Sequence, residues 1–360
     1  MQVHIPLLII CVLLCLLPFS QERRRNIILP ICTLMITVYM AIRYDYGLDF
    51  WSYYMGFVGS ERRTEYTEPL YWLFNSFFTK YCQLIAAVSI ILMVAVFFIV
   101  RKYVRDKYYG LFFLCFLCIP GLSFTSMTAL RSDLAFVFLA WGLCRYYIEK
   151  QNTVMYLLFV VLATMFHNSV VVFVLVPILG KVILKANPYV IFGLFIVFSF
   201  FSFTGITQKI GLTLFGLFGS SSEYYDVYAT KYISNANGAI GRLPFIFPAY
   251  YICKFACTQK DGLFPKFYVL AVIYFSIFFL SMDFEYRYTL YIFIFAFIAM
   301  IMSLERQDAL NMTIAILPVV VYCIFQLYGY YMLMRSTING AYSEGNFFIY
   351  ETIFQNKPFI

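Results

Sequence analysis

Apolar runs of about 15 to 20 residues recur along the whole sequence and constrain its fold more than any other feature. At a rise of about 1.5 Å per residue, each run can cross a hydrocarbon core of about 30 Å as an α-helix. A membrane β-barrel would instead need strands of about 10 residues with alternating hydrophobicity, which the sequence does not show. Because 63% of the 360 residues are hydrophobic and only 12% are charged, we expect an all-α polytopic membrane protein.

Charged residues and clusters of Pro, Gly and Asn divide the sequence into about twelve expected spans. These are residues 3–19, 26–42, 83–100, 108–124, 130–148, 153–166, 169–184, 188–203, 243–257, 265–281, 288–304 and 309–328. The run 69–100 is too long for one straight span, so its first part is expected to be an interfacial or re-entrant helix. The prediction is one membrane domain over residues 1–360, with extracytoplasmic loops at 43–82 and 204–242.

The basic residues predict which side of the membrane each loop occupies. Fifteen of the 26 Lys and Arg residues, but only six of the 18 acidic residues, fall on one side of this arrangement. That side is expected to be cytoplasmic, which places the N-terminus outside. The formal net charge of +8 is therefore a topology signal and gives no reason to expect nucleic-acid binding. Because Arg23-Arg24-Arg25 follows the first apolar run, that run is expected to be a retained helix and not a signal peptide.

Five polar groups lie at ends of apolar runs, and this orientation places all five on the outer side. They contain Asp49, Glu68, Arg131, His167 and Arg287. A charge at the bilayer centre is disfavoured by about 2.5 to 3.5 kcal/mol, which explains the depth of these residues but not their shared side. We therefore predict one extracytoplasmic site.

The same polar groups belong to motifs that follow one another in order along the chain. The motifs are Arg43 with Gly47-Leu48-Asp49 and Tyr53, Glu68-Pro69-Leu70-Tyr71, Leu130-Arg131 with Ala135, Phe166-His167-Asn168-Ser169, and Arg287-Tyr288. This ordered set resembles the EpsG family of Wzy-like polymerases of bacterial surface polysaccharides, which include O-antigen polymerases. The chain departs from the family at Ser132, where Gln is more usual after the arginine.

The resemblance implies an enzyme with a GT-C-like membrane glycosyltransferase fold, acting on the periplasmic face of the bacterial inner membrane. Its substrate would be an undecaprenyl-pyrophosphate-linked oligosaccharide. The protein would also contact membrane lipid, and no cofactor is expected. A chain-length regulator protein stays open as a further partner. Nucleic acid is not expected as a partner.

Release of undecaprenyl pyrophosphate calls for fixed cations, and arginine suits this because its planar fork stays charged and binds phosphate oxygens in pairs. Arg131 and Arg287 are the first candidates for pyrophosphate binding, followed by Arg43 and Arg242. The alternative is that these arginines form ion pairs with nearby carboxylates, namely Asp133, Asp283 and Glu285.

The attacking hydroxyl of the acceptor must lose a proton, which a carboxylate or a neutral imidazole can take. Asp49, Glu68 and His167 are the catalytic candidates, and the sequence does not rank them. The imidazole of His167 could instead be a helix-end group bonded to a backbone carbonyl or to Asn168. The two acidic residues could instead hold arginines or bind sugar hydroxyls.

The loop 204–242 is rich in tyrosine, whose ring can cover a sugar while its hydroxyl forms hydrogen bonds. Tyr224, Tyr225 and Tyr228 are therefore candidates for glycan binding. The alternative is an amphipathic helix with tyrosines at the level of the lipid headgroups.

Other classes are less favoured by the sequence. Cys115 and Cys118 lie within an apolar run without a second pair at zinc spacing, and no acidic cluster suits a divalent ion, so no metal is expected. A flippase or transporter should carry polar residues near the bilayer midplane, whereas here they gather at one face. An O-antigen ligase, or an acyltransferase that modifies the glycan, stays open as an alternative.

Overall fold

The structure is a computed structural model that describes residues 4–44, 50–59, 68–203, 240–280, 282–338 and 351–352. The described elements are helices apart from two short strands, β1 (Arg43–Tyr44) and β2 (Glu351–Thr352), which pair antiparallel. The predicted all-α class is thus confirmed. The chain divides into two compact units, residues 1–177 with 326–360 (unit 1) and residues 178–325 (unit 2), and each is considered by itself.

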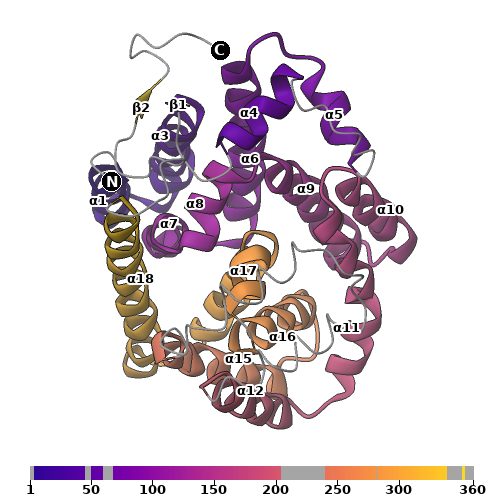
Figure 1. Cartoon of the computed structure of the whole chain (residues 1–360). Helices are drawn as coiled ribbons and strands as arrows, with labels where there is room; N and C mark the ends of the chain where they lie inside the picture. The colour runs from indigo at the N-terminus through magenta and orange to yellow at the C-terminus, as the bar shows by residue number, and fades with distance from the viewer. Residues whose placement is uncertain are drawn as a thin grey trace. The chain divides into compact units, whose positions relative to one another are not determined.

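Unit 1 holds the helices of the first half of the chain, drawn from indigo to magenta in Figure 1. They are α1 (His4–Leu16), α2 (Gln21–Arg23), η1 (Arg24–Ile28), α3 (Leu29–Ala41), α4 (Phe50–Val58), α5 (Pro69–Asn75), α6 (Tyr81–Tyr103), η2 (Asp106–Tyr108), α7 (Tyr109–Cys118), α8 (Pro120–Thr128), α9 (Leu130–Trp141), η3 (Gly142–Glu149), α10 (Thr153–Thr164) and η4 (Asn168–Leu175). Helix α6 packs between α3 and α9, α10 packs on α9, and α1 packs on α7.

Unit 2 is built around the contact of two long apolar helices, α16 (Phe264–Leu280) and α17 (Met282–Leu304). Around this pair pack α12 (Pro188–Phe203) and α15 (Ile246–Thr258), the latter preceded by η6 (Ile240–Phe245). Helix α11 (Val176–Lys185) begins in unit 1 and continues into unit 2, and α18 (Ala309–Ile338) begins in unit 2 and ends in unit 1.

Each of the twelve expected spans coincides with one helix or with two or more consecutive helices. Among the described residues, three helical stretches are long and apolar enough to cross a membrane, namely Tyr81–Tyr103, Asn168–Lys185 and Ala309–Tyr328. The stretch 106–128 is a fourth if its two parts, which are bent by 55°, form one span. The helical nature of the apolar runs is therefore confirmed, and the number of spans stays a prediction.

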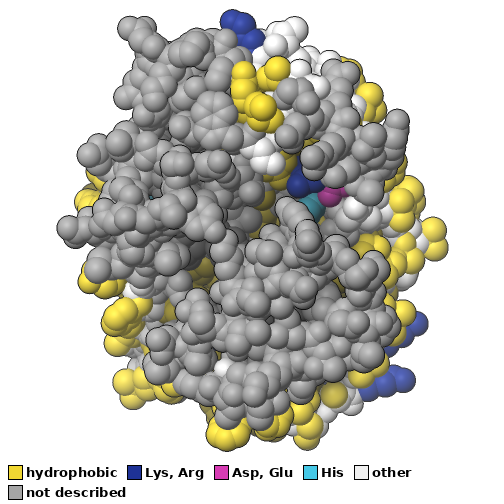
Figure 2. All heavy atoms as spheres, in the orientation of Figure 1, with side chains coloured by type: hydrophobic (Ala, Val, Ile, Leu, Met, Phe, Trp, Pro, Cys, Tyr) yellow, Lys and Arg dark blue, Asp and Glu magenta, His cyan; other side chains and the backbone are white. Residues whose placement is uncertain are grey.

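Large apolar side chains point outward from many of these helices, as the yellow margins of Figure 2 show. Leu34 is 62% exposed, Phe98 61% and Ile178 61%, although each lies on a regular helix. Water would disfavour such surfaces, whereas lipid chains would not. These helices thus have the surface expected of an integral membrane protein.

Side-chain hydrogen bonds stabilise the break between α7 and α8. Pro120 has no N–H to donate to the turn before it, so nearby carbonyls need other donors. The carbonyl of Leu117 accepts from the Ser123 hydroxyl at 3.0 Å and lies 2.7 Å from Nε2 of His4. His4 therefore ties the first helix of the chain to this bend.

The helices that carry the polar motifs cross closely in unit 1. A Cβ atom at Gly142 would come within 2.7 Å of the Cβ of Phe159, so α10 approaches the junction of α9 and η3 as closely as glycine allows. Beyond the end of α10, Phe166 stacks on Phe138 of α9 with 5.0 Å between ring centroids. These contacts hold the segment after α10 against α9.

Candidate active site

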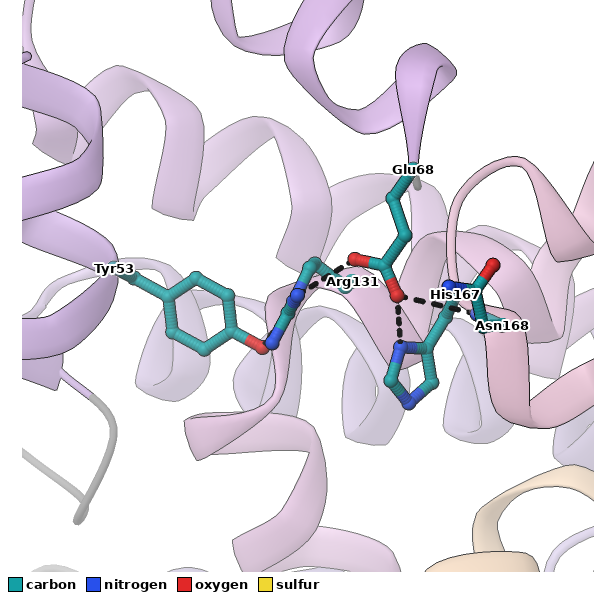
Figure 3. Close-up of polar contacts among 5 residues, drawn as sticks. All are labelled: Tyr53, Glu68, Arg131, His167 and Asn168. Carbon is teal, nitrogen blue, oxygen red and sulfur yellow. Dashed lines mark hydrogen bonds and ion pairs between the residues drawn. The ribbon is translucent and has the colours of Figure 1, made fainter. Parts of the chain in front are cut away.

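Glu68 is the centre of a polar cluster in unit 1, drawn in Figure 3. Its carboxylate is buried, with a side-chain exposure of 5%. One oxygen, Oε1, lies 2.7 Å from Nδ1 of His167 and accepts the backbone N–H of Asn168 at 3.1 Å. The other oxygen, Oε2, accepts Nη1 of Arg131 at 2.6 Å. We call Tyr53, Glu68, Arg131, His167 and Asn168 the Glu68 cluster.

Local backbone structure brings Glu68 beside the histidine. Glu68 directly precedes Pro69, which opens α5 at a position where a missing N–H does no harm. The next N–H, that of Leu70, donates to the carbonyl of Met165 at 3.1 Å and so joins the start of α5 to the end of α10. His167 and Asn168 follow two and three residues later, where α10 gives way to η4. Residues almost a hundred positions apart thereby share one hydrogen-bond network.

Arg131 enters the cluster from the first turn of α9. Besides the ion pair with Glu68, its Nε donates to the hydroxyl of Tyr53 at 3.1 Å, and its Cζ lies 5.2 Å from the centroid of the Tyr53 ring. Its partner is therefore Glu68, whereas the sequence alternative, Asp133 on the same turn, is buried at 1% exposure. Nη2 has no hydrogen-bond partner in the part of the chain that the structure describes.

The charge state of Glu68 follows from its neighbours. Burial raises the pKa of its carboxyl, but the hydrogen bond from His167, the charge of Arg131 and the N–H of Asn168 together lower it below its ordinary value. Glu68 is thus an anion at neutral pH with its oxygens already occupied. Such a carboxylate is a poor proton acceptor and a good anchor for the two side chains around it.

His167 has one ring nitrogen bound and one available. Because an ionised carboxylate can only accept, the Nδ1 beside Glu68 carries the hydrogen. In the neutral ring, Nε2 then has a lone pair, and it has no partner among the described residues. The side chain is 26% exposed. A histidine held by a carboxylate in this way can take a proton at Nε2 and be stabilised as the imidazolium.

Comparison with known proteins shows the family of this chain. The model of the EpsG family matches residues 26–351, which is most of the chain. The chain belongs to the EpsG family. Members of this family are Wzy-like polymerases. No curated protein and no solved structure matches the chain. The family resemblance inferred from the ordered motifs is confirmed, and with the apolar helices it identifies an integral membrane protein.

Three of the EpsG motif residues singled out in the sequence therefore meet in one place: Glu68, Arg131 and His167 (Figure 3). The sequence did not rank Asp49, Glu68 and His167 as proton acceptors. In the structure both oxygens of Glu68 are hydrogen-bonded, whereas Nε2 of His167 has no partner among the described residues. On the face drawn in Figure 2, basic, acidic and histidine side chains are seen together at one point.

Arg43 and Arg242, the other two candidates for pyrophosphate binding with described side chains, are buried. Arg43 of unit 1 is 1% exposed, and its Nη1 donates to the carbonyl of Met40 and, at 3.0 Å, to the hydroxyl of Ser89. Arg242 of unit 2 is 3% exposed, donates to the carbonyl of Phe278 at 2.6 Å and lies over the ring of that residue.

The remaining predicted site residues have side chains outside the described part of the chain. Arg287 lies on the backbone of α17, and its side chain falls outside the described residues. Asp49, Tyr224, Tyr225 and Tyr228 also lie outside them. Within the described residues, no group of three or more His, Cys, Asp or Glu side chains could hold a metal ion.

Two members of the cluster had no assigned role in the sequence. Tyr53 belongs to the first EpsG motif and contacts Arg131 across 78 positions of sequence. The backbone N–H of Asn168 helps to fix the anion of Glu68. The position of Tyr53 in a motif could have marked it as a site residue. The role of Asn168 could not be predicted in this way, because any residue except proline has a backbone N–H.

Proposed function

We propose that this member of the EpsG family joins undecaprenyl-pyrophosphate-linked oligosaccharide repeat units into O-antigen or a related surface polysaccharide. The reaction is a glycosyl transfer on the periplasmic face of the bacterial inner membrane, in a GT-C-like fold and without a metal. The observation that carries the proposal is that one buried carboxylate, Glu68, holds both a cation and a histidine with an open nitrogen.

Arg131 provides the cation for the leaving group. The donor is the growing glycan on its lipid carrier, and the bond that breaks joins its anomeric carbon to a pyrophosphate oxygen. Negative charge grows on that oxygen, so a donor fixed before the reaction stabilises the transition state more than the ground state. The free Nη2 of Arg131 is suited to this contact, because the other two nitrogens are already held.

His167 provides the base for the acceptor. A hydroxyl of the incoming repeat unit attacks the anomeric carbon, its proton passes to Nε2 of His167, and the new glycosidic bond replaces the bond to pyrophosphate. The anion of Glu68 fixes the ring and stabilises the imidazolium that forms. Glu68, first considered as a base, is thereby proposed as the residue that orients the base.

The other candidates keep supporting roles in the proposal. Asp49 is proposed as a further carboxylate that acts on the acceptor, and Arg287 as a second cation for the pyrophosphate. Arg43 and Arg242 rank below them as pyrophosphate ligands because they are almost fully buried and already bonded. A glycan cradle is proposed for the loop 204–242, formed by Tyr224, Tyr225 and Tyr228.

The chain lengths of surface polysaccharide in a strain without this gene test the proposal. Loss of the ladder, with a single repeat unit still attached, is expected for a polymerase. Loss of all attached repeats would instead indicate a flippase or a ligase. Arg287→Ala should also remove the ladder while the protein still inserts, and normal chain lengths would refute a role for Arg287 at the pyrophosphate.

A further inference from the structure

Tyr53 holds Arg131 from the side opposite to Glu68. Its hydroxyl accepts Nε of Arg131 at 3.1 Å, and the guanidinium carbon lies 5.2 Å from its ring centroid. The ring of Tyr53 also contacts the ring of Tyr71 in a T-shaped arrangement, with 5.9 Å between centroids, and Tyr71 is buried at 2% exposure. The phenol of Tyr53 therefore contacts both the guanidinium of Arg131, drawn in Figure 3, and the buried ring of Tyr71.

The helix that carries Tyr53 is itself fixed to its neighbours. A Cβ atom at Gly56 would lie 3.3 Å from the indole of Trp72, so α4 approaches α5 closely. On the same helix, Tyr54 packs on the ring of Tyr81 at the start of α6, with 5.6 Å between centroids. Because α5 begins directly after Glu68, both holders of Arg131 belong to one packed pair of helices.

Glu68 and Tyr53 leave one nitrogen of the Arg131 guanidinium without a partner among the described residues. An arginine has five N–H donors on three nitrogens in one plane. Glu68 takes Nη1 and Tyr53 takes Nε, so Nη2 is the nitrogen left for a ligand. A side chain held at two points and over one face loses less freedom when the ligand arrives, which favours binding.

We propose that Tyr53 is a positioning residue that sets the direction of Arg131, so that Nη2 faces the diphosphate of the lipid-linked donor. This inference rests on the proposed role of Arg131 and extends it. The competing idea is that the Tyr53 hydroxyl only fills the place of a phosphate oxygen and leaves when the donor binds. The two ideas predict opposite changes in affinity when the hydroxyl is removed.

The first test uses the purified full-length chain in detergent, with equilibrium binding of undecaprenyl pyrophosphate as the measurement. Tyr53→Phe keeps the ring over the cation and removes the acceptor for Nε. We expect about tenfold weaker binding, the effect of one hydrogen bond to a charged group. Tyr54→Phe, one residue away on the same helix, is the matched control and should bind like the wild type. Equal or tighter binding by Tyr53→Phe overturns the inference.

The second test separates positioning from a general structural role. In the Arg131→Lys background there is no Nε to hold, so adding Tyr53→Phe should weaken binding by less than about twofold. A merely structural tyrosine would instead cause the same tenfold loss in both backgrounds, and that result contradicts the inference. The melting temperatures of all variants should stay close to that of the wild type.

The Arg131→Ala variant separates failure of the role of Tyr53 from failure of the proposed role of Arg131 at the pyrophosphate. If Arg131→Ala binds undecaprenyl pyrophosphate as tightly as the wild type, the phosphate role of Arg131 fails and the role of Tyr53 fails with it. If Arg131→Ala loses binding while Tyr53→Phe does not, only the role of Tyr53 is refuted.

Discussion

The two histidines of this chain lie in unit 1 in opposite kinds of environment. His4 is fully buried, stacks on Phe124 at 4.9 Å and uses both ring nitrogens, one beside the Leu117 carbonyl and one beside the Tyr39 hydroxyl. His167 is 26% exposed and uses one nitrogen, on the carboxylate of Glu68. A histidine with both nitrogens satisfied can only hold the fold together, whereas one with a free nitrogen can also do chemistry.

The same contrast separates the arginines of unit 1. Arg43 is 1% exposed, and its Nη1 donates to the carbonyl of Met40 and to the hydroxyl of Ser89. The side chain of Arg131 is 34% exposed and keeps one nitrogen open. The two histidines and the two arginines therefore differ in exposure and in which nitrogens they leave unbound. If the proposed roles are correct, they should also differ in function, and the following changes test this.

The largest loss of polymerisation is expected from Arg131→Ala. Removing the cation leaves the charge on the departing pyrophosphate unopposed, and comparable arginines in phosphoryl transfer contribute about 10³-fold or more to rate. Arg131→Lys should restore part of the activity, because it keeps the charge without the planar fork. The measurement is the polysaccharide ladder, with membrane insertion followed in parallel. A normal ladder from Arg131→Ala would show that Arg131, like the buried Arg43, is not needed at the pyrophosphate.

The second largest effect is expected from His167→Gln, which should slow polymerisation about 100-fold, since a positioned base contributes at least this much. The amide can still donate to Glu68, so the fold should keep its melting temperature. His4→Gln is the matched change in the structural environment. It should lower the melting temperature while the activity per folded molecule stays near that of the wild type. Equal activity losses in both variants would show that the two histidines do not differ as described.

Much of the architecture could be predicted from sequence, because lipid imposes a simple rule on backbone polar groups. Each apolar run had to be helical, and the runs from 83–100 and 188–203 coincide with α6 and α12. The break at Pro120 was harder to foresee, because one carbonyl beside it, that of Leu117, is bonded by His4 from the first helix, more than a hundred residues away.

The cluster was only partly predictable for a similar reason. Glu68, Arg131 and His167 could be chosen because the predicted orientation places them on the same side of the membrane and because they belong to an ordered set of motifs. Their roles could not be ranked, since the difference between an anchor and a base depends on which atoms are already bonded. The pairing of Arg131 with Glu68, and not with Asp133 two residues away, is likewise a consequence of where α5 begins.

A third, smaller effect concerns the charge of Glu68. Glu68→Gln keeps an acceptor beside His167 but removes the anion, so we expect about tenfold slower polymerisation, as for carboxylates that orient metal-binding histidines. Because the folded-state pKa of Glu68 is lowered, its ionised form stabilises the wild type above its ordinary pKa of 4.5. That stabilisation is lost as the pH falls through the lowered value. Melting temperatures measured against pH should therefore fall less steeply in acid for Glu68→Gln than for the wild type. Parallel curves would show that the charge of Glu68 does not stabilise the fold.

The smallest effect is expected at Gly142, which is remote from the polar atoms but lies where α10 crosses the junction of α9 and η3. Alanine there would place a methyl group 2.7 Å from Phe159, so α10 must shift away, at an expected loss of about 1 to 3 kcal/mol in stability. Gly193→Ala in α12 is the control, because no side chain or other helix lies within 4 Å of the added Cβ, and it should be neutral or slightly stabilising. Since Arg131 lies on α9 and His167 follows α10, a shifted crossing should also slow polymerisation. A melting temperature lowered without any loss of activity would show that the Glu68 cluster tolerates movement between the helices that carry it.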